Sequence, residues 1–81
     1  KRASNLSPAV IAARGQRIYE SRLKPVLEPQ SNGQIVAIEV ESGDHAVGSD
    51  LLAAADKLQR NHPDSTFYFI RIGSQAVFRL G

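Results

Sequence analysis

The two histidines are the residues of this sequence best suited to metal binding or acid–base chemistry. His45 follows Asp44 directly, and Asp50 comes shortly after them. A metal site needs three or four ligands that converge with fixed geometry. A turn role for Asp44 and an edge-strand role for His45 explain these residues more simply. His62 lies next to Pro63 at a predicted helix end, where a positive charge suits the helix dipole, so we expect no metal site.

Two carboxylates form the second candidate for chemistry. Glu39 and Glu41 alternate along one predicted strand, so both side chains should point the same way about 7 Å apart. That spacing suits acid–base catalysis, but solvent-facing acids on a half-exposed strand have the same spacing. The sequence contains no Gly-x-Ser-x-Gly elbow, no P-loop and no Gly-x-Gly-x-x-Gly motif. We therefore expect a protein that is not an enzyme and has neither catalytic residues nor cofactors.

The basic residues are concentrated in the first third of the chain. Residues 1–24 carry a net charge of +5, whereas residues 25–81 carry −3. A basic surface can bind the phosphates of a nucleic acid, although a solvated helix face explains the same charges. No helix-turn-helix, RNP-type aromatic pair or KH loop accompanies them. The basic side chains on the exposed side of the predicted first helix are Arg14, Arg17 and Lys24, joined by Lys1 and Arg2.

Length and composition indicate one small globular domain. The 81 residues are 42% hydrophobic and 22% charged, and they include no cysteine. A chain of this size buries about 60% of its unfolded surface, and no disulfide or thiolate metal site can add stability. We expect a flexible tail over residues 1–6 and a single domain over residues 7–81. No apolar run approaches the roughly 18 residues of a membrane span, so we expect a cytoplasmic protein without a membrane partner.

Two helices are predicted from capping residues and apolar spacing. Ser7 and Pro8 provide an N-cap and a first helical residue, and Pro25 predicts that this helix ends or kinks near Lys24. A second helix begins after Asp50 and ends before an Asn-His-Pro-Asp turn. The first helix should bury Ile11, Gly15, Ile18, Tyr19, Leu23 and Val26. The second should bury Leu51, Ala54, Ala55 and Leu58.

Alternating apolar residues predict four strands around these helices. They cover residues 34–40, 44–47, 66–72 and 75–80. The first strand is apolar on both sides and should be central, whereas the second is short and polar, as an edge strand should be. The order predicts an α+β fold, in which an N-terminal helix precedes a ββαββ unit with a four-stranded antiparallel sheet. We expect the first and third strands at its centre.

The turn between the first two strands contains Ser42-Gly43. A two-residue turn here would place Glu41 opposite Asp44, and like charges that face each other destabilise a strand pair. We therefore expect a wider turn.

Each face of the predicted sheet carries apolar side chains that another element must bury. Phe67, Phe69 and Phe78 should lie under the second helix. The opposite face is too apolar to stay exposed in so small a protein, so either the first helix or a second subunit covers it. Arg71, on the face assigned to the core, needs a structural partner or a contact with another molecule, and structural pairing is the simpler interpretation. The side chains assigned to the opposite face are Tyr68, Ile70, Ile72, Val77 and Arg79.

The chain resembles a family of small uncharacterised bacterial proteins, often cyanobacterial, with an αββαββ arrangement and no established activity. The residues that carry the resemblance are Ile11-Ala12-Ala13-Arg14-Gly15, Ile18-Tyr19-Glu20, Gly33, Val36-Ala37-Ile38-Glu39, Gly43-Asp44, Val47-Gly48, Phe69-Ile70-Arg71-Ile72-Gly73 and Arg79-Leu80-Gly81. They span nearly the whole chain and are mostly structural. The resemblance implies a small partner or antitoxin-like protein.

These features predict a protein that acts through its surfaces. We expect a small non-enzymatic protein-interaction module that self-associates as a homodimer. The alternative is a nucleic-acid-binding or antitoxin-like protein that uses the basic first helix. The contact surface would be the second sheet face, the first helix, or both. The candidate interaction residues are Arg14, Arg17, Lys24, Tyr68, Ile70, Arg71, Ile72, Val77 and Arg79.

Overall fold

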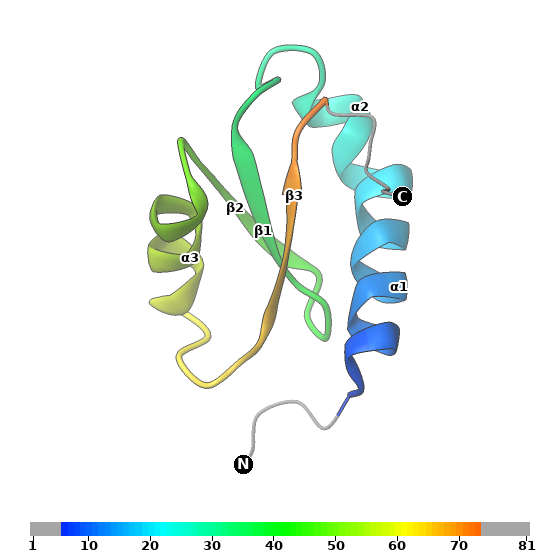
Figure 1. Ribbon diagram of the computed structural model, residues 1–81, viewed down its shortest axis with the longest axis vertical. Coiled ribbons are helices and arrows are strands. Elements are labelled where there is room, and N and C mark those ends of the chain that lie inside the picture. The colour runs from blue at the N-terminus through cyan, green and yellow to red at the C-terminus, as the bar shows by residue number, and fades with distance from the viewer. Residues whose placement is uncertain (1–5, 74–81) are drawn as a thin grey trace, which may run out of the picture.

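Helices cover both faces of an antiparallel sheet (Figure 1). The computed structural model describes residues 6–73. In chain order its elements are α1 (Pro8–Ile18), the π-helical turn η1 (Tyr19–Leu23), α2 (Lys24–Leu27), β1 (Ile35–Glu39), β2 (Asp44–Gly48), α3 (Leu51–Gln59) and β3 (Phe67–Arg71). Within this range the sheet has three strands in the order β2-β1-β3, which confirms the α+β fold and the central first strand. Residues 1–5 and the predicted fourth strand at 75–80, with Val77 and Arg79, lie outside the described residues.

The N-terminal helix begins at its predicted cap but continues past Pro25. Ser7 Oγ accepts a hydrogen bond from Val10 N at 3.2 Å. Near the other end the chain forms a π turn, in which Lys24 N donates to Tyr19 O. Proline has no N–H for the ordinary bond to the preceding helical turn, and a π turn accommodates such a defect. The helical path therefore runs on through α2, so of the two outcomes predicted from Pro25, an end or a kink, the helix does not end near Lys24.

The π turn also decides which apolar residue faces the core at the end of this helix. Val26, expected to be buried, is 68% exposed, whereas Leu27 is buried. An α-helix rotates about 100° per residue, and η1 inserts one residue into a turn. Each later side chain is displaced by one position, so Leu27 takes the place predicted for Val26.

β1 is buried along its whole length, and its pairing fixes the turn that follows. Ile38 pairs with His45, and Glu39 pairs with Asp44. The connection therefore consists of residues 40–43, which confirms that the turn is wider than two residues.

Alternate residues of β1 contribute to two separate cores. Val36 and Ile38, followed by Val40 in the turn after β1, belong to the core beneath α1, η1 and α2. Ile35 and Ala37 belong to the core beneath α3, to which β3 adds its phenylalanines 67 and 69. Because successive side chains on a strand point to opposite faces, the two layers follow directly from the strand, as predicted.

The same chain covers the second face of the sheet. Tyr68 and Ile70 pack against the α1-side core, and Ile72 is one of its buried members. Leu6, which the sequence places in a flexible tail, also packs against this core. α1 can approach β3 because residue 15 is glycine: a Cβ on Gly15 would lie 2.3 Å from Tyr68 Cδ2. Of the two predicted covers, the N-terminal helix is therefore the one that the structure uses.

The second predicted helix, α3, has the expected cap but a different exposed side. Asp50 Oδ1 accepts a hydrogen bond from Ala53 N at 2.9 Å, and Ala54 and Leu58 are buried. Leu51, predicted to be buried, is 49% exposed. The helix approaches the sheet most closely one turn later, where Ala53 and Ala54 lie against the edge of β2, and this leaves its first turn facing solvent.

Candidate functional site

An open hollow of about 310 Å³ lies between α1 and the end of β1. Ala13, Ile18 and Val40 supply its apolar lining, and Arg14 and Arg17 supply its charge. Val40 is buried and Ile18 half-buried, whereas both arginines are exposed. The hollow thus combines an apolar base with two guanidinium groups that water can reach.

Helix geometry explains why these side chains meet. Residues three and four positions apart share one side of a helix, which brings Ala13 and Arg14 next to Arg17 and Ile18. Val40, the first residue of the turn after β1, completes the lining from the sheet. The small Ala13 side chain leaves room between its larger neighbours.

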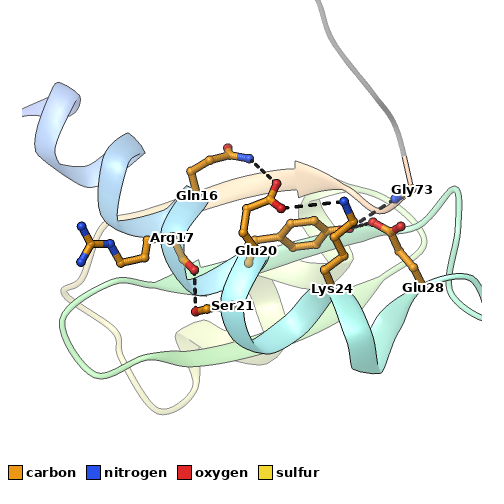
Figure 2. A network of polar contacts seen from close by, with 8 residues as sticks. Gln16, Arg17, Glu20, Ser21, Lys24, Glu28 and Gly73 are labelled. Atoms are coloured by element: carbon orange, nitrogen blue, oxygen red, sulfur yellow. Dashed lines mark hydrogen bonds and ion pairs between the residues drawn. The ribbon is translucent and has the colours of Figure 1, made fainter.

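The arginines of the hollow have no acidic partner within the described part of the chain. The ion pairs among residues 6–73 are Lys24–Glu20 at 3.8 Å, Arg60–Asp56 at 3.1 Å and His62–Asp44 at 2.9 Å. Figure 2 shows the Arg17 guanidinium pointing away from Glu20. Two positive charges therefore remain available at this surface.

Lys24, predicted on the same side as the arginines, takes part in a different contact. Its Nζ lies 3.8 Å from Glu20 Oε1, and Gln16 Nε2 donates to Glu20 Oε2 at 3.5 Å. These side chains form one line of polar contacts along the helix (Figure 2). Lys24 is absent from the lining of the hollow, so the predicted basic face divides into two parts.

Arg22 was not predicted on the basic face, yet it extends toward the same turn as the hollow. Its Nη1 lies 2.9 Å from the position that a Cβ on Gly43 would occupy. Gly43 has a φ of +84°, a conformation that favours glycine. A helical repeat counted from Arg14 includes Arg22 at i+8, so the spacing of the basic residues could have indicated this proximity.

The β3 residues predicted to form a contact surface instead hold the chain together. Arg71 is exposed, and its Nη1 donates to Gly33 O at 3.0 Å, which is a structural contact with backbone rather than with an acid. Tyr68 OH donates to Gln16 Oε1 at 3.1 Å. Ile70 and Ile72 pack under α1, so neither offers a free apolar face.

The histidine region contains a pair that the sequence did not predict. His62 Nε2 and Asp44 Oδ2 lie 2.9 Å apart and connect β2 to the segment after α3. The hydrogen bond to His62 lowers the pKa of Asp44. His45 is exposed, and no group of three potential metal-ligating residues occurs in the described residues.

The alternating pattern of the strand predicts that the side chain of Glu39 faces solvent, but the structure buries it. It is only 2% exposed, and its Oε1 accepts a hydrogen bond from Ser42 N at 2.8 Å. Burial acts to raise its pKa, but the hydrogen bonds donated by Ser42 outweigh burial and lower the pKa below its ordinary value. Glu41, by contrast, is exposed in the turn. The two carboxylates therefore have different roles, and Glu39 stabilises the turn that carries Val40.

A buried tyrosine connects three segments on the other side of α1. Tyr19 is 4% exposed, its hydroxyl donates to Glu28 Oε2 at 2.5 Å, and it accepts a hydrogen bond from Gly73 N at 3.3 Å. Burial and then the hydrogen bond to Glu28 raise the pKa of Tyr19 to about 12. The contact between Tyr19 and Gly73 could not be predicted from residue spacing, because the two residues lie far apart in the sequence.

Alkaline solution is therefore expected to destabilise the fold through Tyr19. The unfolded chain loses this proton near pH 10, whereas the folded chain retains it to about pH 12. The unfolded state thus binds fewer protons between these values, and the free energy of unfolding should fall as pH rises, by about 2–3 kcal/mol in all. Urea unfolding at a series of pH values measures this dependence.

The matched controls for this experiment are two phenylalanine variants. Tyr19→Phe should remove the alkaline loss. Tyr68→Phe, which changes the other tyrosine of the chain, should keep it. Equal alkaline losses in the wild type and in Tyr19→Phe would contradict the assignment to Tyr19.

The comparisons with known proteins found no match. No protein-family model matches the chain, and neither the curated proteins nor the solved structures contain a significant match. None of the described helices is long and apolar enough to cross a membrane. The geometry of the described residues is therefore the basis on which a function can be assigned.

Proposed function

We propose that the chain is a small non-enzymatic interaction module that binds an acidic partner protein in the hollow beside α1. The observation that carries the proposal is the pairing of an apolar base with two unneutralised guanidinium groups. Exposed apolar surface gains from burial, and arginine forms bidentate hydrogen bonds with carboxylates. An aliphatic side chain flanked by Asp or Glu meets both requirements.

The size of the hollow supports a single anchoring side chain. Its volume of about 310 Å³ lies at the low end of ligand pockets in proteins. Ala13, Ile18 and Val40 would contact that side chain, and Arg14 and Arg17 would contact the acids beside it. Because the site is open to water, the arginine contacts should add specificity and speed of association as well as affinity.

The chemistry of the lining supports binding without catalysis. The side chains that line the hollow are aliphatic or guanidinium groups. Neither kind acts as a nucleophile or as a general base at neutral pH. The titratable groups with shifted pKa values, Tyr19, Glu39 and Asp44, are absent from the lining and make structural contacts.

Nucleic-acid binding is the second candidate, because guanidinium groups also bind phosphates. Arg14, Arg17 and the nearby Arg22 favour it. The apolar lining favours the protein partner, because phosphates gain nothing from Ile18 and Val40. An antitoxin-like role is compatible with both candidates, because such a role is defined by the activity of the partner.

Titration of labelled protein separates the two candidates. The probes are a blocked pentapeptide with leucine between two pairs of glutamates, the same peptide with glutamines, and single-stranded DNA. The acidic peptide should shift the amide resonances of residues 13–18 and 40, and binding should weaken as salt rises. The glutamine peptide should bind at least about tenfold more weakly. Stronger binding of DNA than of the acidic peptide would favour the second candidate.

Substitutions on one helix provide the matched variants. Arg14→Gln/Arg17→Gln should weaken binding of the acidic peptide at least about tenfold, because both charge-assisted hydrogen bonds are lost. Lys24→Gln removes a charge from the same helix outside the hollow and should leave the affinity within about twofold. Equal affinities in all three proteins would contradict the proposed site.

A further inference from the structure

We propose that the edge of β3 that faces away from β1 binds the chain's own residues 74–78, in a register set by a turn at Ile72-Gly73. These five residues lie outside the described part of the chain. The inference goes beyond the proposed function, because this edge is a different surface from the hollow. It specifies which backbone groups the added strand pairs with.

The backbone of β3 offers a row of groups to another strand. β3 is an edge strand of the described sheet (Figure 1). Ile72 N donates to Gln34 O at 2.8 Å, and Ile72 O accepts from Gly33 N at 2.9 Å, so both groups face the side of β1. Backbone groups alternate in direction along an antiparallel strand. The residues whose groups point away from β1 are therefore Phe67, Phe69 and Arg71.

These outward groups have no backbone partner within residues 6–73, whereas the edge along β2 is covered. Lys57 Nζ donates to Val47 O at 2.6 Å. A Cβ on Gly48 would lie only 2.4 Å from Ala54 N, so α3 packs directly against this strand. Covered edges do not pair with further strands. In the described sheet, β3 thus provides the edge to which a strand can be added.

The turn after β3 directs the following residues back along this edge. Ile72 and Gly73 form a turn, and Gly73 has a φ of +81°. A positive φ at the second central position belongs to type II and type I′ turns. Arg71 and Ser74 flank this turn, so they form the first pair of an antiparallel hairpin. The five residues from 74 to 78 then match the five residues of β3 in length.

A turn at Gly73-Ser74, which these residue types also suit, does not fit the hydrogen bonds of β3. That turn would make Ile72 the residue that exchanges two hydrogen bonds with residue 75. Ile72 N and O instead bond to the segment that precedes β1. A turn that begins one residue earlier uses the outward groups of Arg71 and leaves the bonds of Ile72 intact.

The proposed register also brings apolar side chains together on the α3 side of the sheet. It places Ala76 opposite Phe69 and Phe78 opposite Phe67. The rings of Phe67 and Phe69 pack edge to face with their centroids 6.5 Å apart, and both side chains are only half-buried. Cross-strand apolar pairs stabilise a sheet, so the added strand would bury more of both phenylalanines.

Nuclear magnetic resonance of the full chain tests the pairing. The amide protons of Phe67 and Phe69 should exchange at least about tenfold more slowly than unpaired amides. The Hα atoms of Ile70 and Gln75 should lie in contact, because the Cα atoms of such a pair are about 4.5 Å apart. A contact of Ile70 with Val77 instead would indicate a register shifted by two residues. That result, or fast exchange at both phenylalanines, would overturn the proposal.

Two proline variants test which backbone groups of the added strand face β3. In the proposed register the N–H of Ala76 donates to Phe69 O, and the N–H of Val77 points to solvent. Proline lacks this donor, so Ala76→Pro should accelerate exchange of the Phe69 amide at least about tenfold. Val77→Pro, the matched control, should leave it within about twofold. Equal rates in the two variants, or the reverse order, would contradict the pairing.

A disulfide tests the register and shows whether the strand belongs to the same copy. The chain has no cysteine, so Ile70→Cys/Gln75→Cys contains a single pair. Oxidation should form the bond within a monomer, and Ile70→Cys/Val77→Cys should react at least about tenfold more slowly. Circular dichroism checks that both variants fold. Disulfide-linked dimers as the main product would assign the strand to another copy and overturn the proposal.

Discussion

Gly48→Ala is expected to lower the free energy of unfolding by about 2–3 kcal/mol. A Cβ on Gly48 would lie 2.4 Å from Ala54 N and 2.8 Å from the carbonyl carbon of Ala53. These are backbone atoms of α3, so the clash cannot be relieved by a side-chain rotation. The helix must move away from the edge of β2, which would loosen the core that contains Ala54 and Leu58. Chemical denaturation of the two proteins measures the loss.

Gly15→Ala is the comparison variant, and it should also destabilise the fold. A Cβ there would lie 2.3 to 2.9 Å from Cδ2, Cγ and Cβ of Tyr68, and rotation of the ring cannot move the Cβ, which is fixed to β3. Alanine favours the helix by about 1 kcal/mol relative to glycine. This gain offsets part of the clash, so we expect a loss of about 1–2 kcal/mol. A Gly15→Ala protein as stable as the wild type would contradict the close approach of α1 to β3.

Glu39→Ala is expected to lower the free energy of unfolding at pH 7 by about 2 kcal/mol. The buried carboxylate accepts a hydrogen bond from Ser42 N, and alanine would leave the turn without this acceptor. Glu39→Gln keeps an oxygen acceptor and loses the charge, so its loss should be about half as large. Denaturant unfolding of the three proteins at pH 7 gives both values.

The pH dependence identifies the charged form as the stabilising one. The pKa of Glu39 is lowered in the folded chain, so the unfolded chain takes up this proton first as pH falls. The contribution of Glu39 is complete above its ordinary pKa of 4.5 and is lost as pH falls through its lower folded value. The stability difference between the wild type and Glu39→Gln should therefore shrink in acid. Asp44 and His62 are present in both proteins and cancel, and a difference that stays constant to low pH would contradict the assignment.

Several features of the fold could be predicted because they depend on neighbouring residues. Ser7 and Asp50 were identified as helix caps, and each accepts a hydrogen bond from a residue three positions later. The alternation of β1 predicted its two buried faces. The like charges of Glu41 and Asp44 predicted a turn wider than two residues, as the pairing of Glu39 with Asp44 confirms.

The candidate site was predicted only in part. Arg14 and Arg17 were selected from their charge and spacing, and the structure places both in the hollow. Lys24 was grouped with them but contacts Glu20 instead. Val40 was predicted as a buried strand residue, and its place in the lining depends on how α1 crosses the end of β1. Charge spacing identifies a helix face, but it cannot say which part of the sheet lies beside that face.

The sequence by itself determined the helix caps, the buried central strand and the basic first helix, because each depends on the types and spacing of residues close in the chain. The tertiary structure alone decided the burial of Leu27, the exposure of Leu52, the contact of Tyr19 with Gly73 and the hollow itself. The physical reason is that these features depend on long-range packing and on one local change of helical repeat. A π turn shifts every later side chain of its helix, and the approach of α3 to Gly48 determines which of its leucines reaches solvent.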